Sequence, residues 1–313
     1  MSRKVSHLLS ISDLTSQDIW RLIRTAGTLK GVRSGALAGR TLGLLFQKPS
    51  MRTRVSFDVA MYQLGGRAIY LSQAEVGLGT RESVRVVARV LSRYLDGIVA
   101  RVYTHKDVET LARYADVPVI NGLSDVEHPC QALADLMTIY EKKGALKGLT
   151  IAFLGDGNNC AASLALGAAM LGANFRIGSP KGYWLSNDVV GRVRKYAEAA
   201  GAQVLCTDDP DDAVRDADVV YTDVWISMGQ EDTAERRRAA FLPYRVTDKV
   251  LLKARPGALF MHPLPAHPGE EITADLLEHP QSVVYDQAEN RLHIQKALLL
   301  ERLGTGASEI RPS

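Results

Sequence analysis

A short segment near residue 50 combines the groups that bind a phosphate. Residues 47–50 have the composition of a turn, and Ser50 stands where the N-cap of a following helix is expected. Free backbone N–H groups and the helix dipole favour an anion at such a position. Arg52 and Thr53 add a cation and a hydroxyl, whereas Arg54 is two residues further on and is expected to be structural. Local chemistry leaves two hypotheses open, a phosphate site or a plain N-cap beside solvated arginines.

A second polar group precedes another predicted helix. Pro129 suits the first helical position, so His128 lies just before the helix and Gln131 lies in its first turn. An imidazole can donate a hydrogen bond to a carbonyl oxygen, and the Gln amide oxygen can accept from an –NH₂ group. Taken alone, a histidine before a helix is more often a cap or a satisfied loop residue. Arg101 ends an apolar run and could reach an anion there, or could equally be a surface arginine.

Two further segments could hold an amino-acid substrate or a nucleotide. Asp223 ends a predicted strand, where its carboxylate could bind an ammonium group or serve only as a turn residue. The turn at residues 154–159 follows a strand and suggests a dinucleotide site. However, Cys160 stands where the third glycine is required, and Arg176 stands near the expected position of the ribose-binding acid. The nicotinamide hypothesis is therefore disfavoured, and no cofactor is expected.

A possible metal site is suggested by His262, His267 and Glu271. These residues lie in a loop that is interrupted by proline, without the helical i, i+4 geometry of a metal-binding helix. We therefore expect no metal.

The elements that carry these residues alternate between short apolar runs and longer amphipathic segments. The runs lack strict polar alternation, which suits strands covered on both faces in a parallel sheet. They are 41–46, 68–71, 97–102, 117–120, 150–154, 174–177, 204–206, 219–222, 259–261 and 283–285. The amphipathic segments are 84–95, 130–141, 160–171, 188–200 and 290–311. This alternation predicts an α/β fold with two doubly wound parallel-sheet domains joined by interdomain helices.

Length and composition fit a two-domain globular enzyme. The chain has 313 residues, of which 46% are hydrophobic, and a formal net charge of +3. The block Arg236-Arg237-Arg238 is flanked by acids, so neither nucleic acid nor a membrane is expected as a partner. Cys130, Cys160 and Cys206 form no CxxC motif, which favours a reducing cytoplasm.

Several of these segments together resemble the aspartate/ornithine carbamoyltransferase family. The string PSMRTRVSFD is similar to the family's Ser-x-Arg-Thr-Arg signature, with Met51 where Thr is often found. HPCQALADL is similar to its second signature and DQAENR to a late one, in the same order along the chain. The resemblance implies a carbamoyl phosphate-binding domain at 1–145, an acceptor-binding domain at 146–290, and a C-terminal helix at 291–313 packing back toward the first domain.

The resemblance also assigns roles to individual residues. Carbamoyl phosphate would be bound by Ser50, Met51, Arg52, Thr53, Arg101, His128, Gln131, Pro263, Leu264 and Arg291, with Arg291 reaching it from the second domain. The transferring carbonyl would be handled by Arg52, Thr53, Arg101 and His128. The acceptor would be held by Asn159, Asp223, Ser227 and Met228, and Ser-Met-Gly after Asp-Val-Trp is similar to the ornithine branch.

One departure concerns the acceptor. The ornithine branch has His-Cys-Leu-Pro where this chain has His262-Pro263-Leu264-Pro265, and the proline belongs to the aspartate branch. Because the Ser-Met-Gly segment is similar to the ornithine branch, the expected activity is still transfer of a carbamoyl group to ornithine, in arginine biosynthesis. Putrescine, a modified ornithine or aspartate are alternative acceptors, and a non-catalytic relative is a further alternative. The segment Gly77–Ser83 resembles a loop that enters a neighbouring subunit's site, which implies a homotrimer or a multiple of trimers.

Overall fold

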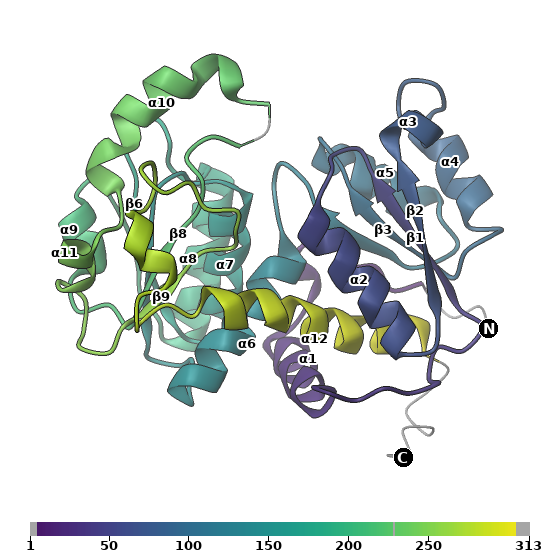
Figure 1. Ribbon diagram of the computed structural model, residues 1–313, viewed down its shortest axis with the longest axis horizontal. Helices are drawn as coiled ribbons and strands as arrows, with labels where there is room; N and C mark the ends of the chain where they lie inside the picture. Colours follow the sequence, from purple (N-terminus) through teal and green to yellow (C-terminus); the bar gives the residue numbers. More distant parts are fainter. Residues whose placement is uncertain (1–4, 228, 305–313) are drawn as a thin grey trace. The chain divides into compact units, whose positions relative to one another are not determined.

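The computed structural model describes residues 5–227 and 229–304. The chain divides into two units: residues 1–134 with 290–313 form unit 1, and residues 135–289 form unit 2. Each unit contains one parallel sheet flanked by helices, which confirms the predicted α/β class (Figure 1). The division falls inside helix α6 (Pro129–Lys143), and helix α12 (Val284–Leu303) likewise supplies residues to both units. The functional limits at 145 and 290 stay predictions.

Unit 1 is built on a four-stranded sheet with the order β2-β1-β3-β4. Its strands are β1 (Thr41–Phe46), β2 (Arg67–Ser72), β3 (Gly97–Arg101) and β4 (Val119–Leu123). Its other helices are η1 (Ile11–Asp13), α1 (Ser16–Thr28), α2 (Met51–Gln63), α3 (Gln73–Val76), α4 (Val84–Leu91) and α5 (His105–Tyr114). The apolar sides of α4 and α5 pack on β1 and β3 in one buried cluster. Apolar burial of this kind supplies most of the stability of a small sheet domain.

The C-terminal helix α12 is fixed to unit 1 by polar as well as apolar contacts. Lys296 is fully buried, and its Nζ donates to the Leu29 carbonyl (2.8 Å) and to Gln63 Oε1 (3.0 Å). Arg21 on α1 pairs with Glu301 near the end of α12. Figure 1 shows α12, in yellow, running beside α1 and α2. A buried ammonium is tolerated only when its hydrogen bonds are satisfied, so these contacts define where the helix lies.

Unit 2 has a five-stranded sheet with the order β7-β6-β5-β8-β9. Its strands are β5 (Thr150–Leu154), β6 (Asn174–Gly178), β7 (Val204–Thr207), β8 (Val219–Thr222) and β9 (Leu259–Met261). Its helices are α7 (Asn159–Met170), α8 (Asn187–Ala200), α9 (Pro210–Val214), η2 (Glu231–Thr233), α10 (Ala234–Phe241), η3 (Leu242–Tyr244), α11 (Asp248–Leu251) and η4 (Ala274–Leu277). In both sheets the strand order reverses beside the first strand, and ligands of such sheets bind at that point.

One predicted strand is wrong. The apolar run at 283–285 was expected to extend the sheet, but only Ser282 forms an isolated bridge, to Phe260. The chain then enters α12 at Val284, six residues before the predicted helix start at 290. Three apolar residues fit a strand or a helix equally well, and the longer helical segment decides between them.

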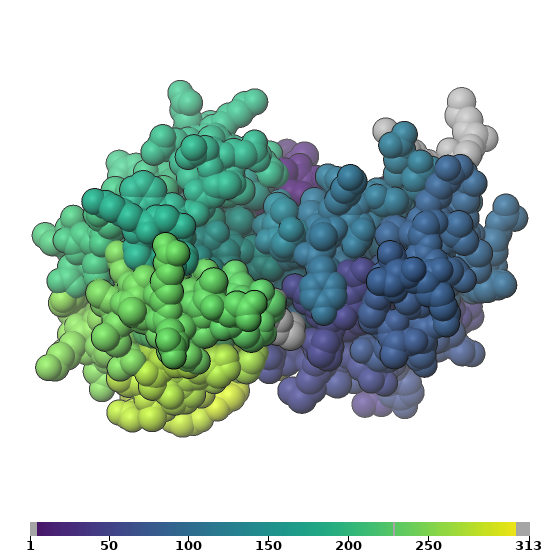
Figure 2. Space-filling view, turned by 90° about the horizontal axis from the view of Figure 1, so that it is seen from above, coloured from purple at the N-terminus to yellow at the C-terminus, as the bar shows by residue number. Residues whose placement is uncertain are grey.

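Within the described part of the chain, no helix combines the length and the apolar character needed to cross a bilayer. Figure 2 shows unit 1 in purple to blue and unit 2 in teal to yellow-green, each as a closely packed surface.

Candidate active site

The start of α2 has the geometry that the sequence predicts. Ser50 is the N-cap in extended conformation, and its Oγ accepts from the Thr53 backbone N–H at 3.3 Å. Thr53 is buried, and Arg52 in the same turn is partly buried. Arg54 lies over the Tyr70 ring at 3.9 Å, in agreement with a structural role. This helix start therefore presents backbone N–H groups of a first helical turn beside one cation, which is suited to a phosphate.

Arg101 is brought next to this helix start by the sheet register. β1 and β3 pair in parallel with Phe46 opposite Arg101, and the Gln47 N–H donates to the Arg101 carbonyl at 2.8 Å. The strand order reverses between these two strands, so both carboxyl ends open on the same crevice. Arg101 is only 8% exposed, which is unusual for a surface arginine. The burial favours the ligand role over the surface role.

A hydrogen-bonded chain joins three of the predicted residues in unit 1. Arg291 on α12 donates through NH1 to Gln131 Oε1 (2.5 Å) and through NH2 to Thr53 Oγ1 (3.0 Å). Arg291 lies in unit 1, with the part of α12 that packs on that unit. The contact spans 238 positions between Thr53 and Arg291, so no local pattern in the sequence could indicate it.

His128 is held neutral by its surroundings. It is 5% exposed, and burial lowers its pKa well below the usual value, with Arg291 and Arg101 lowering it further. Burial is the main cause, because a buried ring loses the hydration that stabilises its charged form, and the two nearby cations act in the same direction. A neutral imidazole can still donate one hydrogen bond to a carbonyl oxygen. Nearby Cys130 is also inert, since burial raises its pKa to about 11.

In unit 2 the corresponding reversal of strand order brings Asp223 beside the turn after β5. β5 and β8 are paired with Leu154 opposite Thr222, and Asp223 follows directly. Asn158 caps α7 and donates from Nδ2 to Asp223 Oδ2 at 2.8 Å. Asn159, the residue indicated by the resemblance, is the first residue of α7. Asn158 was missed because a capping role alone explains it in the sequence.

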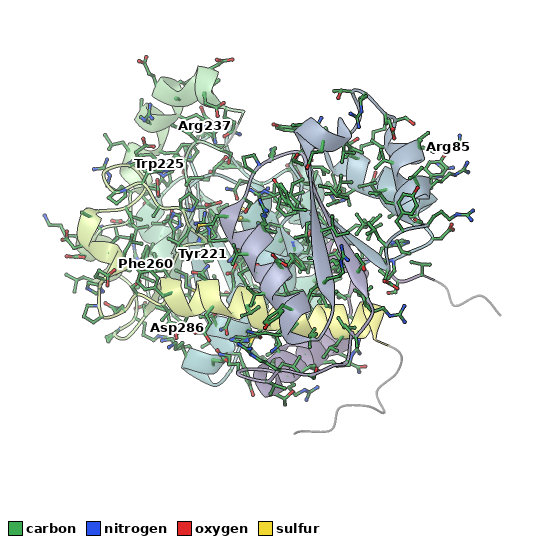
Figure 3. The ribbon with its side chains drawn as sticks, turned by 45° about the vertical axis from the view of Figure 1, so that its right-hand side comes forward. Arg85, Tyr221, Trp225, Arg237, Phe260 and Asp286 are labelled. Atoms are coloured by element: carbon green, nitrogen blue, oxygen red, sulfur yellow. The ribbon has the colours of Figure 1, made fainter. Side chains whose placement is uncertain are left out.

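The segment that follows Asp223 is held by Arg237, which no local sequence pattern indicates as a functional residue. Arg237 on α10 is 7% exposed and donates from Nε to the Trp225 carbonyl at 2.6 Å. Its NH2 group pairs with Asp156, and its guanidinium lies 4.9 Å from the Tyr183 ring centroid. Figure 3 shows Arg237 and Trp225 close together. Burial raises the pKa of Asp156 to about 6 even though Arg237 opposes this shift.

The loop after β9 is fixed at its start by a buried network of polar side chains. Gln287 Oε1 accepts from the His262 N–H at 2.9 Å, while its Nε2 donates to Asp135 Oδ1 at 2.8 Å. Tyr221 donates to the other oxygen of Asp135 at 3.0 Å. Leu264 has a φ of 59°, which is rare for a residue with a side chain and often marks a functional position.

The predicted residues thus fall into two groups. Ser50, Met51, Arg52, Thr53, Arg101, His128, Gln131 and Arg291 belong to unit 1, and Asn159, Asp223, Ser227, Pro263 and Leu264 belong to unit 2. The Ser227 N–H donates to Gln230 Oε1 at 3.0 Å, and Met228 lies outside the described residues. Arg101 and Asp223 lie at the carboxyl ends of strands, and Ser50 and Asn159 lie at helix starts.

Comparisons with known proteins identify two domains along the chain, and the second of them includes Arg291. Residues 6–141 match the domain described as "Aspartate/ornithine carbamoyltransferase, carbamoyl-P binding domain", and residues 147–301 match the "Asp/Orn binding domain" of the same description. Ornithine carbamoyltransferase from Pyrococcus abyssi is 52% identical over 309 residues, covering 97% of this chain and 98% of the relative. The anabolic ornithine carbamoyltransferase of Pyrococcus furiosus is 52% identical over 302 residues, covering 95% and 96%.

A solved structure, the ornithine carbamoyltransferase from Pyrococcus furiosus, is similar along the whole chain. It aligns with a TM-score of 0.94 at 51% identity, covering 97% of this chain and 99% of the other.

Proposed function

Because the chain belongs to the aspartate/ornithine carbamoyltransferase family, we propose that the two groups of residues bind the two substrates of its carbamoyl transfer. The chain is a carbamoyltransferase that acts on ornithine and carbamoyl phosphate, as the relatives at about half identity indicate. The reaction transfers the carbamoyl group to the δ-amine of L-ornithine and yields L-citrulline and phosphate. The residue assignments that follow are the proposal.

The phosphate is assigned to the start of α2. The observation that supports this assignment is the gathering of hydrogen-bond donors around one helix start. Backbone N–H groups at residues 50–53, the Arg52 guanidinium and the buried Arg101 supply donors around one helix start. Arg291, which is already bonded to Thr53 and Gln131, supplies a further cation. The backbone carbonyls of Pro263 and Leu264 are assigned to the carbamoyl –NH₂ group.

The acceptor is assigned to Asp223, Asn159, Ser227 and Met228. A carboxylate that accepts from Asn158 keeps lone pairs for an ammonium group, which supports Asp223 as the site of the α-amine. Among the described residues 221–227 and 229–230 there is no arginine or lysine, whereas an aspartate acceptor would require a cation for its second carboxylate. This composition favours ornithine over aspartate.

The chemical step is direct attack of the neutral δ-amine on the carbamoyl carbon. The bond from that carbon to the phosphate oxygen then breaks, the attacking nitrogen gives up one proton to the departing phosphate, and the phosphate leaves into the α2 helix start. Thr53, Arg101 and the neutral His128 are assigned to the oxyanion, where preorganised donors are each worth about 3–4 kcal/mol. Holding both substrates together supplies the remaining advantage.

An acceptor panel tests this function. Purified enzyme with carbamoyl phosphate is given ornithine, putrescine, N-acetylornithine or aspartate, and both the carbamoylated product and phosphate are measured. Citrulline formation is expected to dominate. Faster turnover of another amine would reject ornithine as the substrate, and no phosphate release with any amine would reject the enzyme function. Ping-pong kinetics with a carbamoylated enzyme would reject direct attack.

Assembly and location are proposals of a different kind. We propose a homotrimer, or a multiple of trimers, in which residues 77–83 of one subunit complete the site of another. A cytoplasmic location, expected from the cysteine pattern, stays a prediction.

A further inference from the structure

Glu271 has one carboxylate oxygen that is fully committed to its surroundings. The Leu264 N–H donates to His262 Nδ1 at 2.9 Å, so the ring proton is on Nε2 and points to Glu271 Oε1 at 3.2 Å. The His267 backbone N–H donates to the same oxygen. Burial opposes ionisation of Glu271, but these hydrogen bonds outweigh it and lower its pKa.

The second oxygen is in a different situation. Glu271 is 0% exposed, and its Oε2 has no hydrogen-bond partner among the described residues. A buried charged oxygen of this kind is rare and requires an explanation. Oε2 lies 3.8 Å from His267 Nδ1, and a Glu270 carboxylate oxygen completes a set of three ligand atoms within 4.8 Å of one another.

We propose that His267, Glu270 and Glu271 bind one divalent transition-metal ion, with Zn²⁺ as the representative. The set offers one imidazole nitrogen and two carboxylate oxygens, a combination that zinc accepts at about 2.0–2.2 Å with a fourth position left for water. The His262 ring and the His267 backbone N–H both bond to Glu271 Oε1, so they hold the carboxylate in place and leave Oε2 for the metal.

The loop brings these ligands together although they are not on a helix. Gly269 has a φ of 95°, and the Glu270 N–H donates to the His267 carbonyl at 2.9 Å, which closes a tight turn. No metal was expected from the sequence, because a loop interrupted by proline lacks helical i, i+4 geometry. A turn with a left-handed glycine achieves the same convergence by another route.

Access and competition both bear on the proposal. The side chain of His267 is 50% exposed, and the chain around residues 265–280 lies at the surface of unit 2, in yellow-green in Figure 2. Arg238 pairs with Glu270 at 2.9 Å and competes with a metal for that carboxylate. Exposed pairs of this type contribute little, so a divalent ion can displace the arginine.

The test is a calorimetric titration of the full-length enzyme with zinc chloride, in reductant and without substrates. Wild type is expected to bind one ion per chain at this site. His267→Ala should weaken binding by more than the roughly 10–100-fold that loss of an outer-shell partner costs. Arg238→Ala should tighten it, because the competing cation is removed. His279→Ala, which alters a histidine outside the cluster in the same unit, should leave it unchanged.

Zinc-edge anomalous scattering from soaked crystals gives the location. Density between His267, Glu270 and Glu271 supports the proposal, whereas zinc bound only elsewhere overturns it. Equal affinity in wild type and His267→Ala also overturns it. In that case, the contact with His267 Nδ1 at 3.8 Å is the whole environment that the described residues give this oxygen. The side chains of His267 and Arg238, which these variants alter, are each 50% exposed, so misfolding of a core variant does not produce the result. The titration contains no substrates, so its outcome does not depend on the carbamoyl-transfer assignment.

Discussion

At the scale of single residues, the start of α2 contains two arginines with opposite expectations. Arg52 lies in the first helical turn beside buried Thr53, while Arg54 stacks on Tyr70 at 3.9 Å. Arg52→Ala should lower kcat/KM for carbamoyl phosphate by about 10²–10³, the usual cost of one preorganised donor to a developing anion. Steady-state kinetics with carbamoyl phosphate varied measure the effect, with Arg54→Ala as the matched control. Near-normal turnover in Arg52→Ala would refute the phosphate assignment.

His128 should make the free energy of unfolding depend on pH, because its pKa differs between the folded and the unfolded chain. Its folded pKa is depressed by burial and by Arg291 and Arg101, so between that value and its ordinary pKa the unfolded chain binds more protons. Stability from this residue is therefore complete above pH 6.5 and is lost as pH falls, with a slope of at most about 1.4 kcal/mol per pH unit.

The corresponding measurement is denaturation of wild type and His128→Asn at pH 7.5 and 5.5. The loss of stability on acidification should be smaller in the variant, because Asn does not titrate. Equal losses in the two proteins would show that His128 is protonated in the folded state or does not contribute.

At the scale of elements, α10 is expected to position the acceptor segment through Arg237. Its guanidinium joins the Trp225 carbonyl to Asp156, so it connects the segment after β8 with the turn after β5. Arg237→Ala should raise KM for ornithine by roughly tenfold or more and leave KM for carbamoyl phosphate near wild type. The physical reason is that an uncompensated buried Asp156 remains, which costs about 3–5 kcal/mol when a partner is removed.

Arg236→Ala is the control for that experiment, because Arg236 is the exposed neighbour on the same helix. Thermal denaturation checks that Arg237→Ala is folded at the assay temperature. A parallel rise in both KM values would indicate general damage rather than loss of acceptor positioning.

Some helix starts and strands can be predicted from local sequence patterns alone. Ser50 and the apolar runs at 41–46 and 150–154 are confirmed as an N-cap and as strands, because capping bonds and strand burial depend on near neighbours. The run at 283–285 failed because three apolar residues carry no period, and α12 absorbs them. Arg237 was considered only as one member of the basic block at 236–238, since nothing near it in the sequence indicates that it is buried.

At the scale of the whole molecule, the proposed trimer predicts sharing of active sites between chains. Arg52→Ala and a variant with Thr80→Ala and Arg81→Ala should each be nearly inactive. When the two are dissociated, mixed and reassembled, about a quarter of the sites should combine an intact Arg52 with an intact loop from the neighbour.

Recovered activity and native mass measurement check this prediction together. A trimeric mass with activity near that fraction supports sites shared between subunits. A trimer without any recovered activity would indicate that residues 77–83 do not contribute to a neighbouring site, and a monomeric mass would reject the assembly itself.

Local sequence patterns were sufficient to predict the α/β class, the order of the motifs and the residues at strand ends and helix starts. These features follow from periodicity and capping, which act over a few positions. Three contacts can be found only in the folded chain: Arg291 bonds to Thr53, Asn158 bonds to Asp223, and Arg237 is buried against Asp156.

The tertiary structure also shows that Glu271 keeps one oxygen unsatisfied beside His267, in a loop for which the sequence predicted no metal. The physical reason is common to these cases. A long-range pair forms only where sheet register, helix packing and loop closure bring two side chains to the same place, and no local pattern records that distance.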